Sequence, residues 1–203
     1  MNDTQKLLEI MQNRRDVRGH DFLDKDISDE DLEFILKAGI SAPSVGYSQP
    51  WKFIIIKDKK IKNEIFQNFE IENEKAKEIF KSSKLYPHLK LEGIKETPLN
   101  IAVLYEQPKE DILGMTTMSK MGEYSVVCAV QNMWLMARTL NIGLGWVSIL
   151  DEQKVLKSIK APKNHTLIAY LCLGYVDKFK TEPELKTLKW KKEKKLNELC
   201  KVV

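Results

Sequence analysis

Hydrophobic residues recur at helical spacing in the first third of the chain. The apolar stripe of residues 4–13 predicts a helix, with Thr4 as its candidate cap. A second helix is predicted to start at Ser28, which opens an S-x-x-D capping pattern, and to end before Pro43. The lysine- and glutamate-rich stretch 58–84 carries isoleucine and phenylalanine at helical spacing and predicts one or two amphipathic helices.

Four short aliphatic runs predict β-strands, at residues 51–56, 99–105, 144–150 and 167–176. Between the second and third runs, residues 124–137 contain no charged side chain, and their apolar positions surround a helix on all sides. These 14 residues are fewer than the roughly 20 that cross a bilayer, so a central core helix or a dimer-interface helix is predicted. Strands and helices without regular alternation indicate an α+β fold with a small mixed sheet flanked by helices.

Length and composition indicate one folded domain over residues 1–203. The chain is 43% hydrophobic and 31% charged, which is typical of globular proteins that fold without disulfides or metals. The extension at about 178–203 is rich in lysine but still carries several leucines and Trp190. It has too few apolar residues for a core of its own and too many for a free tail. We therefore expect it to pack on another surface, such as that of a second subunit.

Charge, cysteine and histidine usage limit the class of partner. Lysine and arginine total 33 against 29 aspartates and glutamates, and these charges are scattered, so neither a nucleic acid nor a membrane is expected as partner. The three cysteines are isolated and the N-terminus has no apolar leader, which indicates a reducing cytoplasm. His20, His88 and His165 lack metal-ligand spacing, so we expect surface or capping roles for them and no metal site.

Arginine is concentrated at one place in a chain whose positive charge is otherwise nearly all lysine. Three of its four arginines are Arg14, Arg15 and Arg18, and the fourth is Arg138. The planar guanidinium binds phosphate or carboxylate through two parallel hydrogen bonds, whereas lysine is a general surface cation. The cluster therefore predicts an anion site. The alternative is a solvated turn in which Asp16 pairs with its neighbours.

A loop of small residues, 41–51, follows the second predicted helix. Its two prolines fix the backbone, and Gly46 allows close approach to a flat ligand. Backbone amides and the side chains of Ser44 and Gln49 are candidates to contact the edge of a ring. The alternative is an ordinary connection between a helix and a strand.

Three familiar motifs are absent or misplaced. The G-x-G of residues 143–145 follows a helix and enters a strand, which reverses the order found in dinucleotide-binding sites. Ser148 does not lie in the G-x-S-x-G turn of serine hydrolases, and the chain has no P-loop.

Several blocks of the chain, taken in order, resemble the 5,6-dimethylbenzimidazole synthase branch of the nitroreductase family. The blocks occur in the order found in that family, and together they are specific for it. The similarity extends from about residue 14 to residue 183. The D-V-R and G-W-V-S-I pieces separate this branch from ordinary nitroreductases. The blocks are residues 14–18, 42–46, 49–51, 89–94, 124–125, 128–132, 145–149 and 171–174.

The resemblance implies a nitroreductase-like fold and a homodimer with exchanged terminal segments, with one FMN in each of two clefts at the dimer interface. It implies that reduced FMN is substrate as well as cofactor. Reduced FMN reacts with O2 in that family and is fragmented to 5,6-dimethylbenzimidazole, the lower ligand of vitamin B12, and erythrose 4-phosphate. A separate flavin reductase would supply the reduced FMN as a transient partner, so NAD(P)H would act indirectly.

The resemblance also implies roles for matching residues. Asp16 and Ser148 match the pair that the family uses in chemistry, and a carboxylate beside arginines can act as a general base. Ser148 would position oxygen or relay a proton. The loop at 43–46 would line the isoalloxazine, and Leu91 matches an apolar segment near the ring. The complete implied FMN-binding set is Arg14, Arg15, Asp16, Val17, Arg18, Pro43, Ser44, Val45, Gly46, Gln49, Leu91 and Ser148.

Two other functions remain open from the sequence. A conventional NAD(P)H-dependent nitroreductase or flavin reductase would recycle its bound FMN without destroying it. A non-catalytic flavin-binding dimer would bind FMN without turnover.

Overall fold

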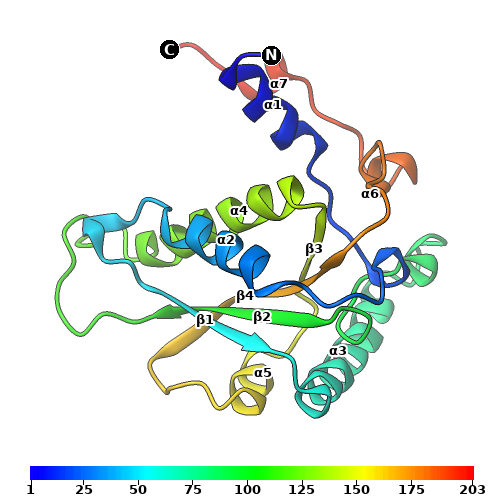
Figure 1. Cartoon of the computed structure of the whole chain (residues 1–203), viewed down its shortest axis with the longest axis horizontal. Helices are drawn as coiled ribbons and strands as arrows, with labels where there is room; N and C mark the ends of the chain where they lie inside the picture. Colours follow the sequence, from blue (N-terminus) through cyan, green and yellow to red (C-terminus); the bar gives the residue numbers. More distant parts are fainter.

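The computed structural model describes residues 1–203 and places a small β-sheet between layers of helices (Figure 1). The strands are β1 (Trp51–Ile56), β2 (Leu99–Glu106), β3 (Ile142–Val147) and β4 (His165–Tyr175). The helices are α1 (Asp3–Asn13), α2 (Asp29–Ile40), α3 (Lys59–Ile79), α4 (Met121–Thr139), α5 (Glu152–Ser158), α6 (Glu184–Thr187) and α7 (Leu196–Leu199). Short 3-10 turns are η1 (Gly19–Asp21), η2 (Val45–Tyr47) and η3 (Tyr86–His88). This is the α+β class that the sequence predicts.

The sheet has the strand order β1-β2-β4-β3, and every neighbouring pair of strands runs antiparallel. The expectation of a mixed sheet is therefore wrong for the four strands. Parallel pairing is limited to an isolated bridge between Asp16 and Leu144, beside β3. Aliphatic runs look alike in parallel and antiparallel strands when helices cover both faces, so the sequence pattern did not reveal strand direction.

Both faces of the sheet are buried, because successive side chains of a strand point into two different hydrophobic cores. Ile101 and Val103 of β2 belong to the core formed with α2 and α4. Ala102 and Leu104 belong to the core formed with α3 and α5. Figure 1 shows these helix pairs on opposite sides of the strands. The sheet is thus the frame that positions α4 and the loops at its ends.

Local patterns predicted most element boundaries within a few residues. β1 spans the predicted residues 51–56, and Ser28 caps α2 as expected. The first helix starts one residue early, because Asn2 and not Thr4 provides the capping oxygen. The stretch 58–84 contains one long helix, α3, and β3 starts two residues before its predicted position.

Helix α4 buries one face and exposes the other. Val126, Val130 and Met133 are fully buried against the sheet, whereas Tyr124 is 48% exposed and Val127 is 40% exposed. The composition of residues 124–137 predicts a helix that is covered on all sides. Within one chain, α4 is covered on one side only. The alternative prediction, a helix that contributes to a dimer interface, stays a prediction. No helix of the chain combines the length and apolar character needed to cross a membrane.

His165 is buried, which corrects the expected surface or capping role. It begins β4, its side chain is 3% exposed, and its Nδ1 lies 2.9 Å from Oδ1 of Asn164. Tertiary packing around the end of β4 covers the ring, and spacing along the chain does not contain that information. His20 and His88 are exposed, as expected.

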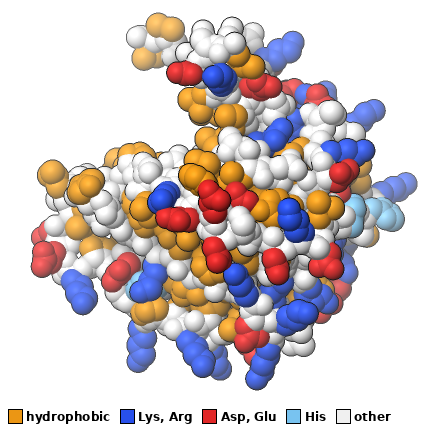
Figure 2. Space-filling view, in the orientation of Figure 1, with side chains coloured by type: hydrophobic (Ala, Val, Ile, Leu, Met, Phe, Trp, Pro, Cys, Tyr) orange, Lys and Arg blue, Asp and Glu red, His pale blue; other side chains and the backbone are white.

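Both ends of the chain project from the body on the same side (Figure 1), and Figure 2 shows hydrophobic side chains on this projection. Helix α1 has no buried residue, and Leu7 is 50% exposed. The tail first packs on its own chain, where the Trp190 ring lies 5.7 Å from that of Phe80 and 6.4 Å from that of Tyr86. Further along, Leu196 of α7 is 76% exposed.

Candidate active site

The arginine-rich segment 14–18 lies against β3. The Val17 N–H donates to the Leu144 carbonyl oxygen at 3.2 Å, and Val17 is 5% exposed. A Cβ atom on residue 145 would stand 2.3 Å from the Val17 carbonyl oxygen. Gly145 therefore allows the two backbones to approach, which explains a glycine in this strand.

Asp16 is held through both carboxylate oxygens. Its Oδ1 accepts a hydrogen bond from the Trp146 N–H at 3.2 Å, and its Oδ2 lies 2.5 Å from Nη2 of Arg18. The side chain is 39% exposed, with protein crowded around its remaining surface. Desolvation by this surrounding protein raises the pKa of Asp16, and Arg18 and the Trp146 amide oppose the rise only in part. A raised pKa suits a carboxyl group for proton exchange closer to neutral pH.

Arg18 connects three parts of the chain. Its side chain is 15% exposed, and it donates from Nη1 to the Leu91 carbonyl oxygen and from Nη2 to the Trp146 carbonyl oxygen, both at 2.9 Å. Together with the ion pair to Asp16, these contacts engage both terminal nitrogens of the guanidinium. Arg18 therefore fixes Asp16, the Leu91 segment and the end of β3 relative to one another.

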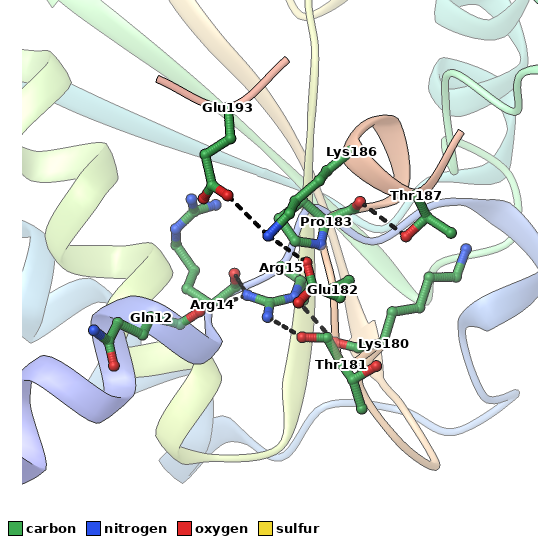
Figure 3. Close-up of polar contacts among 10 residues, drawn as sticks. All are labelled: Gln12, Arg14, Arg15, Lys180, Thr181, Glu182, Pro183, Lys186, Thr187 and Glu193. Carbon is green, nitrogen blue, oxygen red and sulfur yellow. Dashed lines mark hydrogen bonds and ion pairs between the residues drawn. The ribbon is translucent and has the colours of Figure 1, made fainter. Parts of the chain in front are cut away.

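Arg15 binds the backbone of the C-terminal tail (Figure 3). Its Nε donates to the Lys180 carbonyl oxygen at 3.0 Å, and its Nη2 donates to the Thr181 carbonyl oxygen. Its Nη1 donates to the carbonyl oxygens of Gln12 and Arg14, both at 2.7 Å. Because all of these acceptors are backbone carbonyls, Arg15 holds the tail beside the arginine cluster.

Arg14 makes a different kind of contact. Its Cζ lies 4.3 Å from the centre of the Trp134 ring, and Figure 3 shows no polar contact from its guanidinium to the residues drawn. Partial burial lowers the pKa of Arg14, and the charge of Asp16 opposes this change. The guanidinium nonetheless stays a cation at neutral pH, because arginine is protonated under all ordinary conditions.

These side chains line a cavity of about 210 Å³ next to the tail. Five cationic residues of the lining outnumber three acidic ones, and Leu89 and Leu91 add an apolar part. Its volume is below the ~300–1,000 Å³ of common ligand pockets, so a ligand of flavin size needs additional surface. The lining consists of Arg14, Arg15, Asp16, Arg18, Leu89, Lys90, Leu91, Lys180, Glu182, Pro183, Glu184 and Leu185.

The loop that follows α2, which is the second group of predicted ligand-binding residues, is held by hydrogen bonds. Oγ of Ser44 accepts from the Gln49 N–H at 3.1 Å, and the Val45 N–H donates to Oγ of Ser125 at 3.0 Å. Gly46 has a φ of +56°, and a Cβ there would stand 2.7 Å from a side-chain carbon of the loop between β2 and α4. Both the backbone conformation and the close packing therefore require glycine at this position.

The structure does not bring the two predicted groups together within one chain. Val45 is bound near the start of α4 through Ser125, whereas Arg14 and Arg15 contact Trp134 further along the helix. The helix rises about 14 Å between Ser125 and Trp134. Figure 1 shows η2 at one end of the molecule and α6 at the other.

The predicted residues therefore form two half-sites. Ser148 directly follows β3, two residues beyond the Trp146 amide that binds Asp16, and it is exposed. It belongs with the arginine half-site, which comprises Arg14, Arg15, Asp16, Val17, Arg18, Leu91 and Ser148. The loop half-site comprises Pro43, Ser44, Val45, Gly46 and Gln49.

Comparison with known families identifies the fold. The family model described as "Nitroreductase family" matches residues 11–175, which is most of the chain. The chain belongs to the nitroreductase family.

Named members of the nitroreductase family are similar over almost the whole chain. A protein named 5,6-dimethylbenzimidazole synthase from Rhodospirillum rubrum is 37% identical, over 89% of this chain and 87% of its own length. A protein of the same name from Rhodobacter capsulatus is 31% identical, over 91% of this chain and 90% of its own length. A solved BluB-like flavoprotein from Clostridium difficile 630 has a TM-score of 0.71 at 21% identity, covering 97% of this chain and 98% of that one. The structural match shows the shared fold.

The residues of this nitroreductase-family site that were not predicted from the sequence include Trp134 and Lys180. Trp134 lies in the charge-free stretch 124–137 of α4 and contacts both Arg14 and Arg15, and Lys180 lines the arginine cavity from the tail. A tryptophan in an apolar helix still needs an acceptor for its indole N–H, which is the one signal that pointed to a polar neighbour. Lys180 is one of many lysines, and nothing in the sequence distinguishes it.

Proposed function

We propose that this chain is a 5,6-dimethylbenzimidazole synthase that fragments reduced FMN with O2 to 5,6-dimethylbenzimidazole and erythrose 4-phosphate. One observation carries the proposal. The Asp16 carboxylate is held between Arg18 and the Trp146 amide, at an arginine-lined cavity and beside the strand end that bears Ser148. The similarity to the synthases of Rhodospirillum rubrum and Rhodobacter capsulatus supports it.

The arginine half-site suits the phosphate end of FMN. Its cavity has an excess of cationic side chains, and the guanidinium of Arg14 is available to an anion. Leu91 offers an apolar contact for the flavin ring. Reduced FMN, when bound, supplies both the electrons for O2 and the carbon atoms of the benzimidazole. The chain then has to bind the flavin, orient it and move protons.

Asp16 and Ser148 are the residues that we assign to proton movement. Asp16 has a raised pKa and two fixed oxygens, so it can accept a proton and return it without changing position. Ser148 stands next to the same strand end, where its hydroxyl can relay a proton or position oxygen. Arg18 keeps Asp16 oriented, because it also binds the Leu91 and Trp146 carbonyl oxygens.

We propose further that two copies of this single domain, residues 1–203, complete each site. The arginine cavity is too small for FMN, and the loop at 43–49 lies at the far end of α4 within the same chain. A second copy would place its loop half-site beside the arginine half-site of the first. The exposed stripe of α4 with Tyr124 and Val127, and the exposed leucines of α1 and α7, would then be covered. In this arrangement the terminal segments are exchanged, with the end of the extension at 178–203 on the partner.

Electrons are proposed to reach the flavin before it binds. In the proposed cytoplasmic setting, a separate flavin reductase would use NAD(P)H to make reduced FMN and pass it on as a transient partner. NAD(P)H would then need no site on this chain.

The decisive experiment is an aerobic incubation of the purified protein with FMN, NADPH and a separate flavin reductase. We expect 5,6-dimethylbenzimidazole to appear by chromatography and mass spectrometry as FMN disappears, and not in a control without the protein. Asp16→Asn and Ser148→Gly should bind FMN but form little product, whereas the exposed control Asp24→Asn should behave as the wild type.

Two outcomes would contradict the proposal. Steady NADPH oxidation with a nitroaromatic, and no loss of flavin, would identify a conventional nitroreductase or flavin reductase. FMN binding without any turnover in air would identify a flavin-binding protein. An unchanged rate of product formation in both variants would instead show that the roles of Asp16 and Ser148 are wrong.

A further inference from the structure

The three clustered arginines have different partners, and Arg14 is the one whose guanidinium makes no hydrogen bond to the protein. Arg15 donates to backbone carbonyl oxygens, including two of the tail. Arg18 donates to two further carbonyl oxygens and pairs with Asp16. The guanidinium of Arg14 has no hydrogen-bond acceptor among the residues around it in Figure 3, yet it lines the cavity. Its donors are therefore free.

Trp134 determines where that free guanidinium lies. The ring of Trp134 lies 4.3 Å from Cζ of Arg14, a cation–π distance. The same indole donates from Nε1 to the Arg15 carbonyl oxygen at 3.2 Å, which fixes the backbone that carries Arg14. The ring also lies 6.4 Å from the ring of Trp146, whose amide binds Asp16. Trp134 thus contacts the Arg14 side chain, the backbone of the next residue, Arg15, and the ring of Trp146, whose backbone N–H binds the proposed catalytic carboxylate.

We propose that Trp134 is a positioning residue that presents Arg14 as the anchor for the phosphate of FMN, an inference that rests on the proposed function. The indole holds the Arg14 guanidinium, and its N–H donors remain available to two phosphate oxygens. Arg15 and Arg18 then act on the protein itself, by holding the tail and Asp16. Arg14 would then be the arginine that Trp134 positions for the anion, while Arg15 and Arg18 also hold the tail and Asp16 in place.

The test compares binding of oxidised FMN with binding of riboflavin, which lacks the phosphate, by quenching of flavin fluorescence. In the wild type, FMN should bind more tightly than riboflavin. Trp134→Leu should weaken FMN binding by about fivefold to tenfold and leave riboflavin binding unchanged. Trp134→Phe keeps an aromatic face and should retain most of the preference for FMN. A general loss of structure would weaken the binding of both flavins alike. The ratio of FMN affinity to riboflavin affinity therefore reports on the phosphate contact alone.

Phe179→Leu is the matched control. Phe179 lies 4.2 Å under the guanidinium of Arg138, so this variant breaks a second cation–π pair one helical turn from Trp134 without touching Arg14. It should leave the ratio of FMN to riboflavin affinity at the wild-type value. If Trp134→Leu fails to fold, Arg14→Lys provides the test, because lysine keeps the charge but lacks the planar fork, and it should reduce the same ratio.

The outcomes separate this inference from the proposed function. A wild type that binds neither flavin would overturn the proposed function. A wild type that binds both flavins equally would overturn only the phosphate anchor, as would an unchanged ratio in Trp134→Leu. In the double variant of Arg14→Ala with Trp134→Leu, the ratio should equal that of Arg14→Ala alone. A further drop would show that Trp134 does not act through Arg14.

Discussion

The Cβ position of Gly145 lies 2.3 Å from the carbonyl oxygen of Val17, so the arginine segment can follow β3 only because residue 145 has no side chain. Gly145→Ala should push residues 14–18 away from the strand and lower the free energy of unfolding by about 1–3 kcal/mol. FMN affinity should fall with it, because Asp16 and Arg18 lose their contacts to Trp146. Urea unfolding and flavin titration would measure both effects.

The control for this substitution is Gly39→Ala in helix α2. The three nearest atoms to its Cβ would be side-chain atoms of Met133 and Phe53 at 3.0–3.2 Å, which can adjust more easily than a backbone atom. We expect a clearly smaller loss of stability and unchanged FMN affinity. Equal losses in the two variants would show that the contact between Gly145 and Val17 has no special importance.

Asp16 should make the protein less stable as pH rises through the weakly acidic range. Its pKa is raised in the folded chain, so the folded state keeps a proton that the unfolded state has already released. The free energy of unfolding therefore falls between the unfolded pKa and the higher folded pKa. Asp16→Asn cannot release a proton and should lack this fall. Urea unfolding of both proteins over a series of pH values measures the difference.

Asp24→Asn is the control for the pH series, because this exposed carboxylate lies outside the arginine cavity. Its stability curve should run parallel to that of the wild type. A wild-type curve that gains stability relative to Asp16→Asn as pH rises would show that the Asp16 pKa is lowered and would contradict the prediction.

Arg15 should hold the C-terminal tail in place. Arg15→Ala removes donors to the carbonyl oxygens of Lys180 and Thr181, and hydrogen bonds from a charged donor are worth about 1.5–3 kcal/mol each. Amides of residues 180–188 should then exchange with deuterium much faster, while those of β2 and β4 stay protected. Lys186→Ala, which removes exposed ion pairs to Glu182 and Glu193, should leave the exchange unchanged. Equal exchange in wild type and Arg15→Ala would refute the role.

The exposed face of α4 should be the surface between two copies. Val127→Glu places a charge on this apolar stripe, where Val127 is 40% exposed in the single chain. We expect the wild type to sediment as a dimer and the variant as a monomer with much weaker FMN binding, because burying an unpaired charge is costly. Ile71→Glu makes the same kind of change at an exposed position of α3 and should leave the dimer intact. A dimeric Val127→Glu would place the interface elsewhere.

The sequence by itself determined the local elements and the chemistry-bearing blocks. Strand β1 and the Ser28 cap depend on neighbouring residues, and their periodicity is visible without the fold. The concentration of arginine at residues 14–18 also needed no structure, because it is a matter of composition. The resemblance to the nitroreductase family rested on ordered blocks and was confirmed by the family match.

Only the tertiary structure decided how these pieces act on one another. Strand direction, the burial of His165 and the contact of Trp134 with Arg14 depend on residues far apart along the chain. The three arginines are chemically identical, so no sequence pattern distinguishes Arg14, which makes no hydrogen bond to the protein, from Arg15 and Arg18, which bind carbonyl oxygens. That difference arises from the geometry of hydrogen bonding, because each guanidinium takes the acceptors that the folded backbone places within its reach.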